Sequence, residues 1–164
     1  MVTAESVHFS SNSNEWATPQ RLFDRLNAIY GPFTLDPCAT AESAKCAKFF
    51  TMADNGLEQS WQGETVFMNP PYGRQIGKWI RKARQESNTL SGFPAKVVCL
   101  IPARTDTAYW HDCIMTADEI VLLRGRVRFV GGASSAPFPS AVVVFETCGD
   151  TYPSLSTMSA TQGE

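Results

Sequence analysis

The chain has 164 residues, a net charge of −2 and a hydrophobic fraction of 43%, values that fit one globular domain with a sizeable core. No apolar stretch is long enough to cross a membrane and no secretory signal opens the chain, so we expect a cytoplasmic protein without a membrane partner. The five cysteines form no C-x-x-C pair and there are only two histidines, which argues against a metal site or a disulfide framework.

Both ends of the chain lack apolar periodicity. Residues 1–14 are rich in Ser and Asn, and residues 150–164 are rich in Ser and Thr. Such composition cannot bury enough apolar surface to fold, so both ends are predicted to be disordered tails. A single domain over residues 15–149 remains.

The first helix is predicted to begin at Thr18, a good N-cap, with Pro19 as its first helical residue. Leu22, Leu26 and Ile29 follow at helical spacing. After this helix, short apolar runs alternate with amphipathic stretches. The predicted strands are 33–36, 48–51, 66–68, 97–101, 120–123 with a continuation at 127–130, and 141–145; the further helices follow Tyr72 and cover 106–115.

This alternation predicts an α/β sheet with helices on both faces. The last two strands have no helix between them, so they are expected to pair as a hairpin at one edge. Ligands of such sheets bind outside the carboxyl ends of the parallel strands. Asp36 and Asn69 each come at such an end, and the loop 131–139 joins the hairpin on the same side. The sequence therefore predicts one crevice formed by three separated segments.

The stretch Asn69-Pro70-Pro71-Tyr72 follows the apolar run 66–68 directly. Two successive prolines forbid a helix and hold the backbone extended. The side-chain carbonyl of Asn69 and the main-chain carbonyl of Pro70 are two acceptors suited to one amino group, and Tyr72 adds a flat ring for stacking. The alternative is a plain proline-rich turn between a strand and a helix.

Positive charge is concentrated in two places despite the negative net charge. Five basic residues and no acidic one lie between Arg74 and Arg84, and Arg124, Arg126 and Arg128 form a second group. A mildly acidic protein can bind DNA through such surfaces. The alternative for the charged helix face is simple solvation.

Several motifs occur together in one order. They are Glu15-Trp16-x-Thr18-Pro19, Leu35-Asp36-Pro37-Cys38-Ala39, Asp54-x-Gly56-Leu57…Trp61, Asn69-Pro70-Pro71-Tyr72-Gly73, Pro102-Ala103-Arg104-Thr105-Asp106-Thr107, Gly125-Arg126 and Pro137-Phe138-Pro139-Ser140-Ala141. Over residues 15–146 the chain resembles the short phage and prophage type of DNA N6-adenine methyltransferase. The resemblance implies a Rossmann-like methyltransferase sheet, mostly parallel with a C-terminal antiparallel hairpin strand. It also implies S-adenosylmethionine as cofactor and a flipped adenine of double-stranded DNA as substrate.

The resemblance also implies roles for particular residues. The catalytic group is Asn69, Pro70, Pro71 and Tyr72. The cofactor group is Trp16, Thr18, Pro19, Asp36, Pro37, Cys38, Ala39, Asp54 and Asn69. The predicted DNA-binding group rests on charge and position instead, and consists of Arg74, Lys78, Arg81, Lys82, Arg104, Arg124, Arg126 and Phe138.

Several of these roles have alternatives in the sequence itself. Asp36 could instead cap a short helix, and Trp16 could be a core aromatic. Glu42 competes with Asp54 for the cofactor ribose, because no acidic residue stands out after a second strand. The loop after Asp36 also lacks the glycines usual in methyltransferases. Phe138 could enter the base stack or anchor the hairpin.

Two other functions compete with DNA methylation. A protein-glutamine methyltransferase would use the same Asn-Pro-Pro-Tyr chemistry, but its usual Gly-rich first loop and N-terminal helical domain are missing here. A non-catalytic DNA-binding remnant is the other alternative, suggested by the missing glycines.

Overall fold

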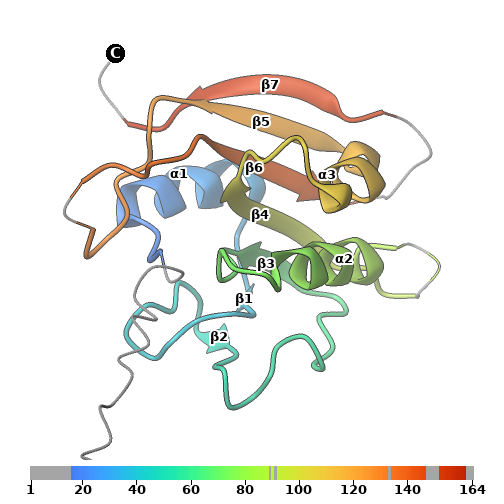
Figure 1. The fold of residues 1–164 in the computed structure, drawn as a ribbon. Helices are drawn as coiled ribbons and strands as arrows, with labels where there is room; N and C mark the ends of the chain where they lie inside the picture. The colour runs from blue at the N-terminus through green and yellow to red at the C-terminus, as the bar shows by residue number, and fades with distance from the viewer. Residues whose placement is uncertain (1–15, 89, 91, 133, 147–151, 162–164) are drawn as a thin grey trace, which may run out of the picture.

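The computed structural model describes residues 16–88, 90, 92–132, 134–146 and 152–161. Within them one seven-stranded sheet has the order β2-β1-β3-β4-β6-β5-β7 (Figure 1). The strands are β1 Leu35–Asp36, β2 Lys48–Phe49, β3 Thr65–Met68, β4 Lys96–Pro102, β5 Glu119–Arg124, β6 Ser140–Phe145 and β7 Ser154–Ser159. The helices are α1 Gln20–Tyr30, α2 Ile76–Glu86 and α3 Ala108–Asp112, and a 3₁₀ turn, Ile114–Thr116, follows α3.

The sheet is mostly parallel, as predicted. Strand β6 runs antiparallel to both of its neighbours, β4 and β5, whereas the other pairings are parallel. The expected antiparallel hairpin strand is therefore confirmed. Its predicted place at the edge is wrong, because β6 lies between β4 and β5 and a further strand, β7, covers the outer side of β5.

Strand β7 lies inside the segment 150–164, so the prediction of a disordered tail is wrong for residues 154–159. Its side chains are serine and threonine apart from Leu155 and Met158, and none is buried, so the strand is held mainly by its parallel backbone ladder with β5. The Arg25 guanidinium also donates to the carbonyl of Ser159 at 2.8 Å. The predicted tail at residues 1–14 lies outside the described residues.

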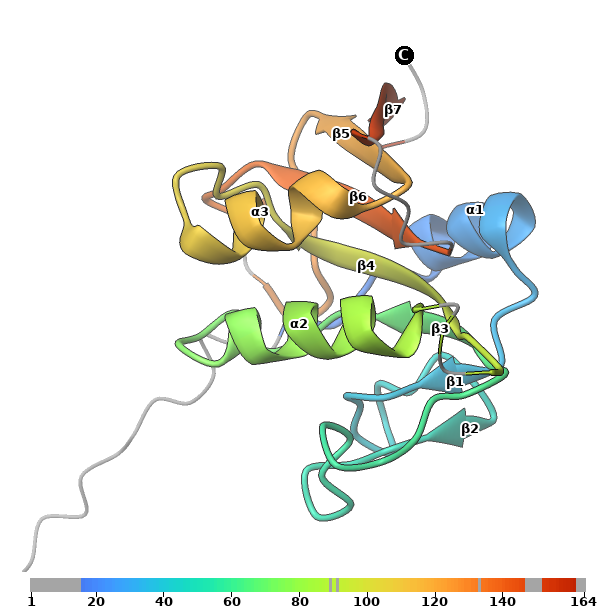
Figure 2. The ribbon, with the colours of Figure 1, turned by 90° about the vertical axis from the view of Figure 1, so that its right-hand side faces the viewer.

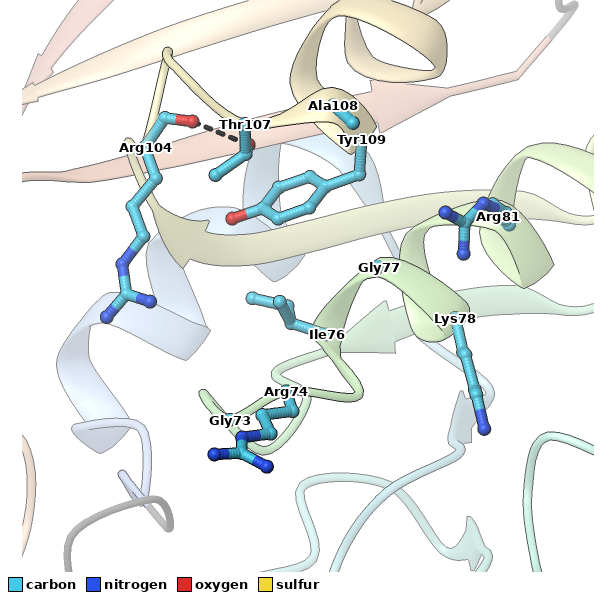
Figure 3. Close-up of a pocket in the computed structure, with 10 residues that line it drawn as sticks. All are labelled: Gly73, Arg74, Ile76, Gly77, Lys78, Arg81, Arg104, Thr107, Ala108 and Tyr109. Atoms are coloured by element: carbon cyan, nitrogen blue, oxygen red, sulfur yellow. Dashed lines mark hydrogen bonds between the residues drawn. The ribbon is translucent and has the colours of Figure 1, made fainter.

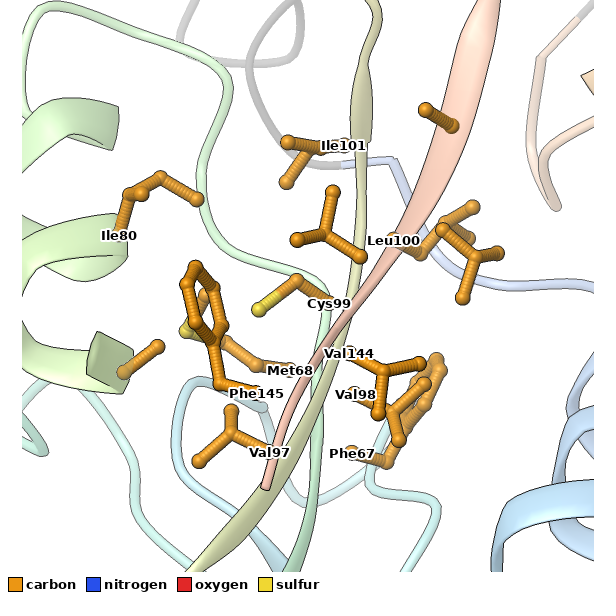
Figure 4. Packing of buried hydrophobic residues seen from close by; sticks show 14 of the residues in the cluster. Phe67, Met68, Ile80, Val97, Val98, Cys99, Leu100, Ile101, Val144 and Phe145 are labelled. Carbon is orange, nitrogen blue, oxygen red and sulfur yellow. The ribbon is translucent and has the colours of Figure 1, made fainter. Parts of the chain in front are cut away.

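Helix α1 covers one face of the sheet, and α2 and α3 cover the other (Figures 1 and 2). Alternation along the strands supplies both faces with apolar side chains. Cys99 and Phe145 lie on the side of Ile80 from α2, whereas Phe67 and Val98 lie on the opposite side (Figure 4). All five are buried. Strands β4 and β6 are thus buried on both faces, which explains their continuous apolar runs.

Two local expectations are corrected. Residues 127–130 do not continue β5; they form only an isolated bridge between Val130 and Ala17. Thr18 is not the N-cap of α1, because the helix begins after Pro19 and has no side-chain cap. Helix α3 is shorter than the predicted 106–115. No helix in the described residues is both long and apolar enough to span a membrane.

Candidate active site at the carboxyl ends of β1 and β3

Asn69 follows β3, and its amide group has a fixed orientation. Its Nδ2 donates to the carbonyl oxygen of Trp16 and, at 2.9 Å, to Oγ1 of Thr18. A carbonyl oxygen can only accept, so the amide nitrogen must face Trp16 and the amide oxygen must face away. No described residue donates to Oδ1 of Asn69. The predicted acceptor is therefore present and oriented.

Pro70 and Pro71 hold the backbone that follows in a loop. Pro70 is buried and Pro71 is exposed. In the part of the chain that the structure describes, no N–H donates to the Pro70 carbonyl. Two acceptors on consecutive residues are thus without a donor, the combination expected from the sequence for holding an amino group.

Tyr72 is only 5% exposed, and its role in stacking on a base stays a prediction. Its hydroxyl donates to the carbonyl of Leu100 at 3.1 Å, and burial raises the pKa of this phenol well above its usual value. The ring packs edge-on against Phe129 and Phe138, with centroids 5.9 and 5.5 Å away. Trp16 contacts the same two rings at 5.5 and 5.4 Å.

We call Trp16, Tyr72, Phe129 and Phe138 the aromatic cluster. It joins the segment before α1, the loop after β3 and the loop between β5 and β6. Both alternatives left by the sequence, Trp16 as a packed aromatic and Phe138 as an anchor of the hairpin loop, agree with these contacts. Phe138 is partly exposed, between two exposed prolines, so it is the member of the cluster nearest to solvent on that loop.

Asp36 ends β1 and is 5% exposed. Its carboxylate accepts from the main-chain N–H of Lys45 at 3.1 Å and of Cys38 at 3.4 Å, and so holds the loop that follows. Burial raises the pKa of Asp36 from 3.8 to about 6, although both hydrogen bonds and the Lys45 charge act to lower it. Asp36 does not cap a helix, since the loop contains only turns.

The loop after Asp36 connects the two strand ends. The main-chain N–H of Asn69 donates to the Cys38 sulfur, and burial raises the pKa of this thiol well above its usual value. The N–H of Ala39 donates to the carbonyl of Phe50 at 3.0 Å. Gly56 lies against the loop so closely that a β-carbon there would come within 2.0 Å of the Pro37 carbonyl oxygen. This contact explains the glycine of the Asp54-x-Gly56 motif.

Asp54 lies on the surface, in the turn before Gly56. Its Oδ2 accepts from the N–H and the hydroxyl of Thr51, at 2.8 and 2.7 Å, and these bonds lower the pKa of the carboxyl. Its alternative, Glu42, is also exposed. The contacts of Asp54 are thus those of a turn residue, and its role at a ribose stays a prediction.

The predicted DNA-binding residues divide into different environments. A pocket of about 440 Å³, which we call the basic pocket, is lined by Gly73, Arg74, Ile76, Gly77, Lys78, Arg81, Arg104, Thr107, Ala108 and Tyr109 (Figure 3). Lys82, which is predicted to bind DNA together with Lys78 and Arg81, does not line this pocket, and its role stays a prediction. Its ammonium pairs with Glu86 and lies 5.5 Å from the centre of the Trp61 ring.

Arg124 and Arg126 lie at and beyond the end of β5. Both are exposed, as is Arg128, and they alternate with buried Val127 and Phe129. This alternation aims the arginines outward while the apolar residues anchor the segment. A second basic surface therefore precedes the loop that carries Phe138.

A family model for DNA N-6-adenine-methyltransferases, described as Dam, matches residues 5–162. The chain belongs to the Dam family. A DNA N-6-adenine-methyltransferase of Haemophilus phage HP1 is 29% identical over 144 residues, which cover 83% of this chain and 80% of the relative. A putative methyltransferase of Escherichia coli K12 is 37% identical over 65 residues, 36% of this chain and 71% of the relative.

A solved structure of a predicted O-methyltransferase from Agrobacterium tumefaciens is similar at a TM-score of 0.40 and 14% identity, covering 77% of each chain. The family expected from the motifs, a DNA adenine methyltransferase of phage type, is confirmed by the family model and the phage relative. The protein-glutamine methyltransferase alternative is thereby set aside.

The residues of this Dam-family chain fit the cofactor that a methyltransferase requires. S-adenosylmethionine carries positive charge, and the buried carboxylate of Asp36 stands at the strand end where the cofactor loop begins. Among the described residues no cluster of three or more His, Cys, Asp or Glu side chains is placed to hold a metal ion.

Sequence reasoning missed two residues of the site. Phe129 was assigned to a strand, although its spacing from Val127 marks it as inward-facing. Tyr109 was counted only as part of a helix, and its unpartnered hydroxyl has no signature in the sequence.

Proposed function

We propose that this protein transfers a methyl group from S-adenosylmethionine to the N6 amino group of an adenine flipped out of double-stranded DNA. The observation that carries the proposal is the pair of acceptors on Asn69 and Pro70. The first is oriented by Trp16 and Thr18, and neither accepts a bond from a described residue.

The chemistry asks the protein mainly for positioning. The lone pair of an adenine amino group is delocalised into the ring, so the nitrogen is a poor nucleophile. Hydrogen bonds from the amino group to Asn69 Oδ1 and the Pro70 carbonyl would favour a pyramidal nitrogen and aim its lone pair. S-adenosylmethionine, when bound, would supply a methyl group activated by the sulfonium, and would leave as the neutral thioether S-adenosylhomocysteine after the S–CH3 bond is exchanged for an N–CH3 bond. The amino group would end with one hydrogen fewer, and the proton would leave to solvent.

The cofactor would lie between the loop after β1 and the segment before α1. Asp36 through Ala39 form one side, with Asp36 either contacting the cofactor or holding the loop around it. Trp16, Thr18 and Pro19 form the other side, and Asn69 adjoins both. Asp54 remains the candidate for the ribose.

The DNA would lie across the strand ends between the basic pocket and the arginines that follow β5. Base flipping brings the target adenine out of the stack and into the protein. The ring of Tyr72 is buried against Phe138, so stacking of a base on this ring requires Phe138 to move aside. We expect the enzyme to act in the cytoplasm of the bacterial host of a phage or prophage.

The test is incubation of the protein with labelled S-adenosylmethionine and unmethylated phage DNA, followed by identification of the modified base. The expected result is labelled N6-methyladenine in the wild-type reaction and an initial rate of labelling about a thousandfold lower with Asn69→Ala. If DNA is bound but no base is labelled, and calorimetry detects no cofactor binding, the chain is a non-catalytic remnant and the proposal is wrong.

A further inference from the structure

The basic pocket lies beside the proposed methyl-transfer site but is separate from it. Gly73, which opens the pocket, comes directly after Tyr72, and Arg104 follows the end of β4. The pocket therefore adjoins the same edge of the sheet as Asn69. It is bounded by α2 on one side and by the turn into α3 on the other (Figure 3).

The charged side chains of the pocket are all cationic, and its other polar side chains are the hydroxyl residues Thr107 and Tyr109. Arg74, Lys78, Arg81 and Arg104 are cationic donors, and no carboxylate or carboxamide lines the pocket. None of these four cations forms an ion pair within the described residues, whereas Lys48 and Lys82 pair with Glu64 and Glu86. A positively charged surface rich in donors matches phosphate oxygens, which only accept. It does not match the major-groove edges of adenine and cytosine, which present an amino donor.

Tyr109 supplies a second, independent observation. The residue is 8% exposed, and its buried hydroxyl has no hydrogen-bond partner among the described residues. Its ring lies across the pocket between Ile76 and Thr107, with the hydroxyl directed toward the side of Arg104 (Figure 3). An unpaired buried hydroxyl costs about 1–3 kcal/mol. An acceptor brought within hydrogen-bond distance of this hydroxyl would remove this cost.

The start of α2 adds to the positive potential. This eleven-residue helix has no acidic residue in its first turn and no side-chain cap at Gln75. Helix N-termini favour anions through their free N–H groups and the helix dipole. Gly77 adds no side chain to the pocket wall, and a β-carbon there would lie in ordinary contact, 3.6 Å from both Arg81 and the Tyr109 ring.

We propose that the basic pocket holds a backbone phosphate of the DNA strand that carries the target adenine, with the Tyr109 hydroxyl donating to a phosphate oxygen. This inference rests on the proposed action on DNA. It assigns a particular ligand group to this site, whereas a general positive surface would attract DNA without any role for a neutral tyrosine.

Tyr109→Phe separates these two cases, because it removes one oxygen and no charge. The dissociation constant of a fluorescent DNA duplex should rise about tenfold, since a hydrogen bond to a charged group is lost. The slope of log affinity against log salt should stay the same. The melting temperature should be equal to or above that of the wild type, because the removed hydroxyl has no partner in the free protein.

Arg74→Gln and Arg104→Gln test the charges of the same pocket. Each should lower the salt slope by roughly 0.9, the value for one lost phosphate contact. Lys48→Gln is the matched control, since Lys48 already pairs with Glu64, and it should leave the slope unchanged.

Wild-type affinity in Tyr109→Phe would overturn the phosphate site even if the arginine variants weaken binding, and the proposed methylation would stand. If the wild-type protein neither binds nor methylates DNA, the proposed function itself fails.

Discussion

Asp36 and Asn69 stand at the carboxyl ends of adjacent parallel strands, yet their polar atoms are used differently. Both carboxylate oxygens of Asp36 accept hydrogen bonds from its own loop, from the N–H groups of Cys38 and Lys45. In Asn69, only the amide nitrogen is hydrogen-bonded, to Trp16 and Thr18, and the amide oxygen has no donor among the described residues. A place at a strand end marks both residues as candidates. A residue whose polar atoms are all bonded locally holds a loop, whereas a residue with an acceptor free of local bonds can hold a substrate.

The largest effect should come from removing the unused acceptor. Asn69→Ala should lower kcat for DNA methylation by about a thousandfold, the upper range for loss of one positioned polar group. Circular dichroism should match the wild type, because Asn69 follows the strand and contributes little packing. Gln62→Ala, which removes another surface amide, is the control and should be fully active. Near-normal turnover by Asn69→Ala would show that the free amide oxygen of Asn69 does not hold the substrate.

The second effect concerns the buried acid. The folded protein keeps the proton of Asp36 up to about pH 6, whereas an unshifted aspartate loses it near 3.8. The wild type should therefore lose stability as the pH rises from about 4 to about 6, by up to about 3 kcal/mol. Asp36→Asn carries no such proton, so its stability should be flatter across this window. Urea unfolding at several pH values measures the free energy of unfolding of the wild type and of Asp36→Asn. The same pH dependence in both proteins would contradict the prediction.

Asp36→Asn should also weaken S-adenosylmethionine binding, measured by calorimetry at pH 7.5. A carboxylate that orders the loop or contacts the cofactor is lost in this variant. Equal dissociation constants would show that Asp36 serves folding alone.

The third effect tests the close packing of Gly56 against the loop that follows Asp36. Gly56→Ala would place a β-carbon 2.0 Å from the Pro37 carbonyl oxygen, and relieving that overlap should cost about 2 kcal/mol of stability. Gly77→Ala is the matched control, because its nearest neighbours would be 3.6 Å away. It lies inside α2 and should be neutral or stabilising by up to about 1 kcal/mol. Equal melting temperatures for the two variants would contradict the close contact.

The smallest effect should come from the residue that orients Asn69. Thr18 is 3% exposed, and Thr18→Val keeps its shape while removing the oxygen that accepts from Asn69. We expect kcat to fall about tenfold, the equivalent of one hydrogen bond, without a change in KM for DNA. Thr18→Ser should restore the rate. A raised KM for S-adenosylmethionine with unchanged kcat would instead assign Thr18 to the cofactor.

The sequence predicted the strands at 66–68, 97–101 and 141–145 because their apolar runs are unbroken, and it predicted the site residues whose chemistry depends on neighbours in the chain. Asn69 with Pro70 is such a case. Contacts between residues far apart in the chain could not be predicted from the sequence. The covering of Tyr72 by Phe138 and Phe129 depends on the loop after β3 meeting the loop between β5 and β6. The pairing of Lys82 is different: Glu86 is one helical turn away, so the i,i+4 rule could have predicted it.

Strand β7 bears on how the chain can be shortened. Its side chains are mostly exposed serine and threonine, and its ladder with β5 runs through main-chain atoms, so many substitutions within 154–159 should be tolerated. Removal of the whole segment is a different matter. A protein ending at residue 149, the boundary that composition suggests, would leave the outer edge of β5 unpaired beside the partly exposed Leu122. Unpaired edges of this kind pair with other chains, so the trimmed protein should aggregate where the full chain stays monodisperse.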